Sequence, residues 1–108
     1  MGNIGISVAG RADPIVDCNE LYQSQLNIGV RKSGKGKFES NRIFDALSHG
    51  VLVEGEKASP IFSGNFISQN CENGVLITGE GATPQFVENE IFRNRKIGLE
   101  NASKANAV

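Results

Sequence analysis

A chain of 108 residues has room for one ordinary domain, and its net charge of −1, from 11 basic and 12 acidic residues spread along it, gives no field that would attract nucleic acid or a membrane. No apolar run is long enough to cross a bilayer, and the N-terminus lacks the basic flank and apolar core of a signal peptide. The bulky apolar residues are mostly Ile, Val, Leu and Phe, and no window keeps them at helical spacing. Composition therefore predicts a soluble all-β protein with no nucleic-acid partner and no membrane partner.

The chain repeats one pattern about every 24 residues. The two clearest copies are GVLVEGEKASPIFSGNFISQNCEN over residues 50–73 and GVLITGEGATPQFVENEIFRNRKI over residues 74–97. Each copy is anchored on its opening glycine, and these glycines are Gly5, Gly29, Gly50, Gly74 and Gly98. This anchoring predicts one repeat domain over residues 1–108, with coils at about 5–28, 29–49, 50–73 and 74–97 and a partial coil at 98–108.

The first strand of each coil follows its opening glycine. It supplies the predicted core stack of Ile6, Val30, Val51, Val75 and Leu99. A second column on the same face holds Val8, Val53 and Ile77, with Lys32 and Asn101 as exceptions. A further glycine then recurs at Gly10, Gly34, Gly55 and Gly79, which predicts a turn that needs positive φ or a close backbone approach.

The second and third strands of each coil flank an asparagine. The second strand supplies the predicted stack of Val16, Phe38, Phe62 and Phe86, and the third supplies Leu21, Ile43, Ile67 and Ile91. The asparagines between them are Asn19, Asn41, Asn65 and Asn89, and we expect them to form a buried ladder of amides. A second column holds Asn70 and Asn94, with Ser24 and Ala46 in the earlier coils.

Three short strands per coil predict a single-stranded right-handed parallel β-helix, a solenoid of about four to five coils. Because the pattern begins almost at Met1, we expect a fragment of a longer solenoid or one that a partner caps. Open ends also predict end-to-end stacking of copies as an alternative. The pattern is lost from Asn101 to Val108, which predicts a partial cap or a frayed tail.

At these columns the chain resembles the β-helix repeats grouped as carbohydrate-binding and sugar-hydrolase (CASH) domains, and the copy over residues 50–70 looks most like those of F-box-type ubiquitin-ligase substrate receptors. Similar coils occur in pectate lyases, polygalacturonases, alginate epimerases and periplasmic copper-site maturation proteins. The resemblance covers roughly residues 5–98. It implies the pectin-lyase-like β-helix fold, and it implies either substrate recognition or activity on a polysaccharide, because one fold carries many activities.

Four candidate sites can be weighed from the residues. Residues 29–36 nearly spell a phosphate-binding loop, but Gly36 stands where a magnesium-binding hydroxyl is needed and no helix follows. Asp17 and Glu39 should stack on an outward face, where two acids are too few for a calcium site. They are the pair that a polysaccharide-active alternative would use as acid and base. Glu20 and Arg42 should form an ion pair between coils. His49 is expected to be a solvated turn residue. The sequence thus predicts no catalytic residue, no metal site and no cofactor, and it favours a protein that is not an enzyme.

Two surface features remain as a candidate binding site, made of Arg31, Lys35, Lys37, Leu52 and Leu76. Coil two is locally basic, which suits an acidic partner, and the two leucines should lie side by side as an apolar contact. The alternative is a solvated turn and scattered exposed leucines. The leading hypothesis is a non-catalytic module that recognises or scaffolds a protein partner, and the rival is a carbohydrate-binding or polysaccharide-active fragment.

The compartment is predicted from the two cysteines. Cys18 and Cys71 fall at different places in the repeat, which predicts two unpaired thiols and a cytoplasmic or nuclear protein. The contrary sign is the glycosylation sequon that begins at Asn101, which keeps a secreted protein as an alternative.

Overall fold

The computed structural model describes residues 4–10, 12–55, 57–78 and 81–101, which form thirteen strands in three parallel sheets. Sheet A contains β1 (Ile4–Val8), β4 (Leu26–Arg31), β7 (Val51–Glu54), β10 (Val75–Thr78) and β13 (Leu99–Asn101). Sheet B contains β2 (Ile15–Asp17), β5 (Lys37–Glu39), β8 (Ile61–Ser63) and β11 (Gln85–Val87). Sheet C contains β3 (Glu20–Tyr22), β6 (Arg42–Phe44), β9 (Phe66–Ser68) and β12 (Glu90–Phe92).

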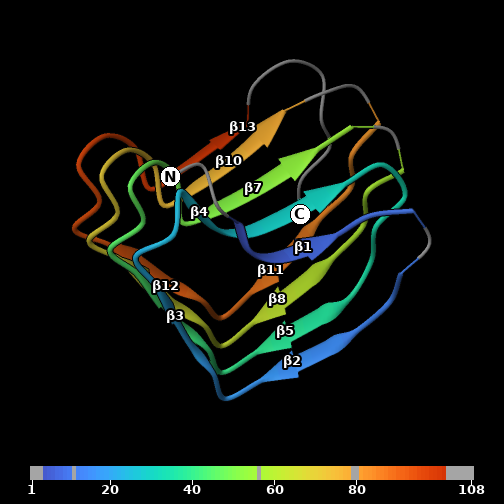
Figure 1. The fold of residues 1–108 in the computed structure, drawn as a ribbon, viewed down its shortest axis with the longest axis horizontal. Coiled ribbons are helices and arrows are strands. Elements are labelled where there is room, and N and C mark those ends of the chain that lie inside the picture. Colours follow the sequence, from blue (N-terminus) through green and yellow to red (C-terminus); the bar gives the residue numbers. More distant parts are fainter. Residues whose placement is uncertain (1–3, 11, 56, 79–80, 102–108) are drawn as a thin grey trace.

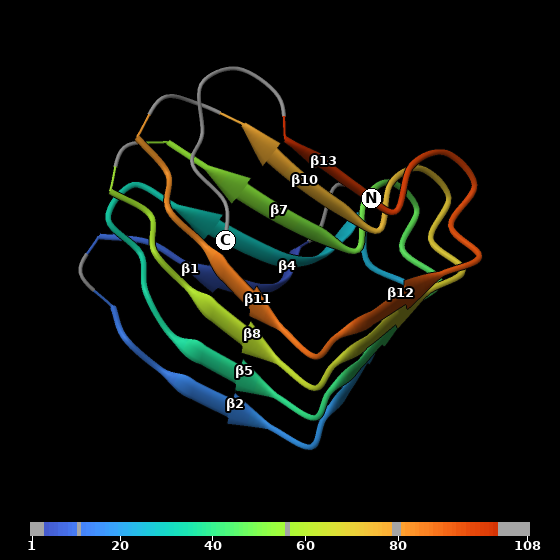
Figure 2. The same ribbon diagram turned by 180° about the vertical axis from the view of Figure 1, so that it is seen from behind.

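Each coil contributes one strand to each sheet, and every strand pairs only with its equivalents in the coils before and after it. Figures 1 and 2 show the three sheets as the walls of a solenoid, and within sheets A and B the strand of coil one is lowest and those of later coils follow above it. This arrangement is the right-handed parallel β-helix that the repeats predict. No helix in the described part of the chain is long and apolar enough to span a membrane.

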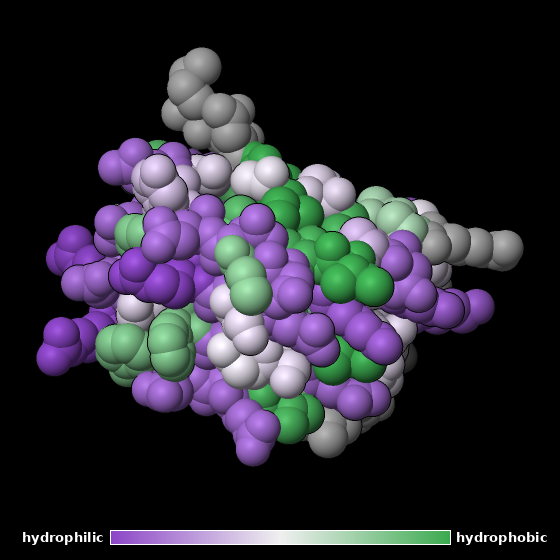
Figure 3. Space-filling model, turned by 90° about the horizontal axis from the view of Figure 1, so that it is seen from below, coloured by the Kyte–Doolittle hydropathy of each residue, from purple (hydrophilic) through white to green (hydrophobic). Residues whose placement is uncertain are grey.

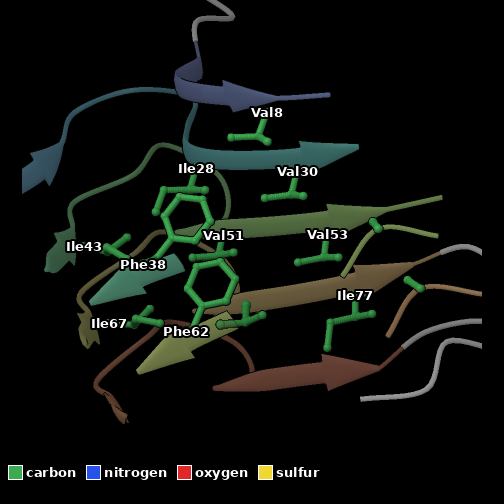
Figure 4. Packing of buried hydrophobic residues seen from close by; sticks show 13 residues of the cluster. Val8, Ile28, Val30, Phe38, Ile43, Val51, Val53, Phe62, Ile67 and Ile77 are labelled. Atoms are coloured by element: carbon green, nitrogen blue, oxygen red, sulfur yellow. The ribbon is translucent and has the colours of Figure 1, made fainter. Parts of the chain in front are cut away.

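The core is made of side chains that alternate inward from the three sheets, as period-two strands require. In the middle coils Val51, Val53 and Ile67 are fully buried, and Figure 4 shows how they surround the phenylalanines. Phe38 stacks on Phe62 with ring centroids 4.7 Å apart, and Phe62 lies 5.0 Å from the ring of the coil-four phenylalanine, Phe86. The predicted phenylalanine stack is confirmed.

The register of coil two corrects the predicted first-strand stack. Ile6 pairs with Ile28, and Ile28 pairs with Val51, so Ile28 and not Val30 belongs to that stack. Val30 instead joins the second column, where it pairs with Val8 and Val53. Lys32, which was assigned to that column from the sequence, does not belong to it. The anchoring glycine, Gly29, caused the error, because it stands two residues beyond the true equivalent of Gly50. A two-residue slip keeps each side chain on its own face, so the inward and outward assignments survive it.

The turn between sheets A and B is only partly as predicted. Gly10 and Gly55 have positive φ, at 68° and 96°. Gly34 lies elsewhere in the turn, where an added Cβ would come within 2.8 Å of the Val8 carbonyl oxygen. The turn glycine predicted at position 79 and the tail predicted after Asn101 lie outside the described residues.

The asparagine ladder is confirmed for Asn41, Asn65 and Asn89, whereas Asn19 in coil one is exposed and its side-chain amide donates to the Asp17 carbonyl of its own coil. The backbone N–H and side-chain amide of Asn41 both donate to Oδ1 of Asn65, at 2.9 and 3.0 Å, and Asn65 donates in the same way to Asn89. The amides of Asn41, Asn65 and Asn89 each also donate to a carbonyl of the preceding coil, as Asn65 does to Phe38 at 2.8 Å. Asn41 and Asn65 are buried with their polar atoms satisfied, so the ladder joins coils without leaving polar groups orphaned.

A second ladder follows sheet C, and coil two builds it differently. Asn70 donates to Oδ1 of Asn94, and the backbone N–H of Ala46 donates to Oδ1 of Asn70. Coil two has Ala46 at this position, so no side-chain oxygen there can accept the backbone N–H of Ser24 in coil one. Asn27, which pairs in register with the glycine column, donates instead to the Phe44 carbonyl at 2.9 Å and accepts the Ser24 N–H at 3.4 Å.

Left-handed backbone conformations mark the corners on both sides of sheet C. One residue per coil has positive φ at the corner before the sheet: Cys18, Ser40, Gly64 and Glu88. One residue per coil has it at the corner after the sheet: Gln23, Asp45, Gln69 and Arg93. Seven of these eight residues are not glycine, so the stacked neighbours hold a conformation that costs an L-residue about 1–2 kcal/mol.

Candidate interaction surface

The predicted binding residues fall on different walls of the solenoid. Leu52 and Leu76 pair in register on the outer face of sheet A, and both are half-buried. Lys37 lies on the outer face of sheet B, while Lys35 lies in the turn between the two sheets. Arg31 ends β4 and pairs with Glu54 at 3.4 Å, a contact that the slipped register concealed. The basic residues therefore follow the circumference of coil two, and the leucines stand together on one sheet.

The outward acidic residues stack as predicted. Asp17 pairs in register with Glu39, and the column continues into Ser63 and Val87. The predicted ion pair also forms, with Arg42 Nη1 at 3.0 Å from Glu20. Both partners are more than half exposed, so such a pair stabilises the fold by only about 0–1 kcal/mol.

Both cysteines are free, as predicted, and both are exposed. The thiol of Cys18 donates to Asp17 at 3.1 Å. That hydrogen bond and the negative charge of the same carboxylate raise the pKa of Cys18, so less of the thiol is ionised at a given pH. Cys18 is consequently a poorer nucleophile than a thiol of ordinary pKa would be.

His49 is not the solvated turn residue that was expected, because its side chain is only 15% exposed. Its Nδ1 accepts the backbone N–H of Asn73 in the next coil at 3.2 Å, and its Nε2 lies 3.5 Å from Glu72. Nδ1 must be unprotonated to accept, which places the proton of the neutral ring on Nε2. His49 thus joins two coils, as the asparagines do.

An open cleft of about 620 Å³ lies where the first strands of coils one to three end. It is lined by Ala9, Gly10, Arg31, Lys32, Glu54 and Gly55. The ion pair of Arg31 with Glu54 occupies its wall, and the remaining lining is backbone, aliphatic or lysine. These residues provide neither a nucleophile with its base nor a pair of carboxylates.

Apolar side chains also reach the surface at the coil-one end of the solenoid. Figure 3 views that end from below and shows green apolar groups among purple hydrophilic ones. Ile15 is 74% exposed, and the inward-facing Ile6, Val16 and Leu21 are only partly buried. The predicted end-to-end stacking of copies would cover these groups, and it stays a prediction.

Aromatic side chains gather on the outer face of sheet C, a surface that the repeat pattern did not predict. The chain has seven aromatic residues, and three of them form the core stack. The other four all lie on this outer face: Tyr22, Phe44, Phe66 and Phe92. The exposed fractions of Tyr22, Phe66 and Phe92 are 50%, 44% and 42%. A signal was available, because each of the four flanks an inward Leu or Ile of the third strand.

The face divides into two halves. In coils one and two, Tyr22 and Phe44 stack with centroids 5.1 Å apart, and the guanidinium of Arg42 lies 4.9 Å from the Phe44 centroid. In coils three and four, Phe66 pairs in register with Glu90, and Phe92 pairs with Ser68. Phe66 and Phe92 are therefore diagonal neighbours on adjacent strands, about 4.8 Å apart in the stacking direction.

The family model described as "Right handed beta helix region" matches residues 1–108, the whole chain. The chain belongs to the right-handed β-helix family. No curated protein and no solved structure matches this β-helix.

Within the described ranges of this β-helix, no three or more His, Cys, Asp or Glu side chains gather in a group that could hold a metal ion. The most distinctive chemical feature of its described surface is therefore the aromatic face of sheet C.

Proposed function

We propose that this β-helix is a non-catalytic recognition module that binds another protein through the outer face of sheet C. The observation that carries the proposal is the placement of every aromatic side chain outside the core on that one face. Aromatic side chains and arginine are over-represented where proteins bind one another tightly. The rings bury a large area with few rotatable bonds, and the guanidinium of arginine stacks on rings and donates several hydrogen bonds. Here Arg42 lies among them.

The fold supports this use of the face. Each ring stands on a short strand that is paired on both sides or on one, and the inward neighbours Ile43 and Ile67 are fully buried. The rings are consequently pre-organised, and binding needs little ordering of the backbone. The resemblance of the repeats to those of F-box-type ubiquitin-ligase receptors agrees with recognition of a protein substrate.

The pair of leucines on sheet A provides a second, smaller candidate contact. Leu52 and Leu76 are half-buried and lie beside glycine and Glu100 on their outer face, so they offer less apolar area than four rings. This difference allows the two faces to be compared directly. A partner that uses sheet A should depend on the leucines, and one that uses sheet C should depend on the rings.

The test places a photo-crosslinking amino acid at Phe66 in one protein and at Leu76 in another, identifies the captured protein, and then titrates that purified partner. Phe66→Ser with Phe92→Ser should weaken binding at least about tenfold, and Leu52→Ser with Leu76→Ser should change it less than about twofold. The reverse order would move the contact to sheet A. Binding to a panel of neutral and acidic glycans, with no dependence of any protein partner on the rings, would support the carbohydrate alternative instead.

A further inference from the structure

The aromatic face lies in the most acidic part of the described surface. We define the sheet C surface as residues 17–23, 39–45, 63–69 and 87–93, which include the strands of sheet C, the corner on each side and the last, outward-facing residue of each sheet B strand. Its charged residues are all exposed: Asp17, Glu20, Glu39, Asp45, Glu88, Glu90, Arg42 and Arg93. Six carboxylates and two guanidinium groups give this surface a net charge of −4, in a chain whose total is −1. Such a surface attracts cationic segments and repels anionic ones.

The half of the surface in coils one and two already holds a guanidinium. Arg42 lies over the ring of Phe44, with 4.9 Å from its guanidinium carbon to the ring centroid, and it pairs with Glu20 at 3.0 Å. A ring below and a carboxylate beside the cation satisfy it in two ways at once, through the π-face and through a charged hydrogen bond. The chain itself thus demonstrates how this face accommodates arginine.

The half in coils three and four repeats the same components without the cation. Phe66 takes the register position that follows Arg42, and its neighbour in the next coil is the carboxylate of Glu90. Phe92 supplies a second ring on the diagonal, and Glu88 stands at the adjoining corner. No cation of the described chain lies over either ring.

We infer that Phe66, Phe92 and Glu90 receive an arginine side chain from a basic segment of a partner protein, held as Arg42 is held by Phe44 and Glu20. The inference rests on the proposed function and specifies its partner. Arginine is preferred to lysine because its planar guanidinium stacks on a ring while it donates to a carboxylate. Glu88 and the remaining net negative charge of the surface then favour further basic residues on either side.

The test uses fluorescent twelve-residue peptides made of four repeats of Arg-Gly-Ser, with matched peptides in which Lys, Gln or Glu replaces Arg. Binding is followed by anisotropy at low and at moderate salt, and the binding surface is mapped by amide chemical shifts of the labelled protein. We expect the Arg peptide to bind best, the Lys peptide several-fold more weakly, and the Gln and Glu peptides not measurably. Shifts should concentrate in β9 and β12.

Variants separate a specific site from general attraction. Phe66→Ser with Phe92→Ser keeps every charge and should weaken the Arg peptide about tenfold. Glu88→Gln with Glu90→Gln should weaken it comparably, whereas Glu54→Gln with Glu100→Gln makes the same change of charge on sheet A and should have less than about a twofold effect. Circular dichroism spectra and unfolding midpoints confirm that each variant is folded.

Equal losses from both carboxylate pairs, or no loss from the ring pair, would overturn the inference by reducing it to non-specific charge attraction. Failure of the Arg peptide to bind, while a captured protein still depends on Phe66, would overturn the inference alone and leave the recognition function in place. If the Arg peptide does not bind and no captured protein depends on Phe66, the proposed recognition function is overturned as well.

Discussion

Coil two and coil three build the same rung from different residues. Their strands pair residue for residue, yet Asn27 faces Gly50 across the register, Gly36 stands at the place of Pro60, and Ala46 stands at the place of Asn70. In coil three, an added Cβ on Gly50 would lie 2.7 Å from the Asn70 amide nitrogen, so the amide fills the space that the glycine leaves. In coil two the two residue types are exchanged. Asn27 stands at the position of Gly50 and its side chain fills the space, while the small Ala46 stands at the position of Asn70.

The difference shows that the repeat conserves a packing volume and a set of hydrogen bonds, and not a residue at each column. One amide must serve the backbone at this corner, and either of two chain positions can carry it provided that the other is small. Four comparisons between the two coils follow from this, beginning with the largest expected effect.

Gly36→Pro should be the most damaging change, although it would make coil two match coils three and four. Gly36 has φ of 126°, which proline cannot adopt, and an added Cβ would lie 3.0 Å from a ring carbon of Phe38. We expect a loss of about 3 kcal/mol in the free energy of unfolding, measured with urea. The opposite exchange, Pro60→Gly, should cost only about 0.4–1 kcal/mol, through the greater freedom of the unfolded chain. A stable Gly36→Pro protein would refute the distinct turn of coil two.

Gly50→Ala and Gly29→Ala should separate two glycines that the sequence repeat treats as equivalent. At Gly50 the new methyl group meets the Asn70 amide at 2.7 Å and the Gly74 carbonyl oxygen at 2.8 Å, and we expect a loss of about 2–3 kcal/mol. At Gly29 the nearest atoms are side-chain carbons of Ile4 at 3.4 and 3.6 Å, which is ordinary contact. That variant should be unchanged or slightly more stable. Equal thermal unfolding midpoints for the two would contradict the corrected register.

Ala46→Asn tests the exchange of the amide between positions. Alone it places a second amide where Asn27 already lies, and Asn27→Gly alone leaves the Ser24 N–H and the Phe44 carbonyl without their partner. Each should cost about 1–3 kcal/mol. The double variant recreates the arrangement of Gly50 and Asn70, so its loss should be smaller than the sum of the two by at least about 1 kcal/mol. Additive losses in urea titrations would show that the positions do not exchange the amide.

Ser40 and Gly64 offer the smallest contrast, at the corner before sheet C. Both have positive φ, at 57° and 65°, but only coil three uses glycine there. Ser40→Gly should gain about 0.5 kcal/mol and Gly64→Ser should lose about the same, because a side chain is strained in this region. Changes of the same sign, measured side by side by calorimetry, would mean that neighbouring coils already relieve the strain at Ser40.

The sequence predicted the fold because inward positions repeat with little tolerance for change. Phe38 and Phe62 must stack, and Asn41 and Asn65 must hydrogen-bond, so these columns are plain in the sequence. The slip in coil two arose because Asn27 occupies the position that glycine holds in the other coils, so the strand lacks its opening glycine. Gly29, two residues later, was mistaken for it.

Outer positions carry less information in the repeat. The ion pair of Arg31 with Glu54 could not be found without the corrected register, which only the pairing of β4 with β7 supplies. The aromatic face was missed for another reason. Tyr22, Phe44 and Phe92 share one column, but Ser68 interrupts it in coil three, where the ring stands two residues earlier, at Phe66. Phe66 and Phe92 become neighbours only when adjacent strands are laid side by side.

The amide ladder has a direction. Asn41 donates to Asn65, and Asn65 donates to Asn89, so every coil borrows its acceptor from its successor. Removing the amide at Asn65 therefore strands the backbone N–H of Asn41, one rung earlier, while the N–H at position 65 keeps its acceptor on Asn89. Loss of the Asn65 amide should therefore disturb coil two more than coil four. Coil two loses the acceptor of the Asn41 N–H and the donor to the Phe38 carbonyl, whereas the Asn89 oxygen keeps one of its two donors from coil three.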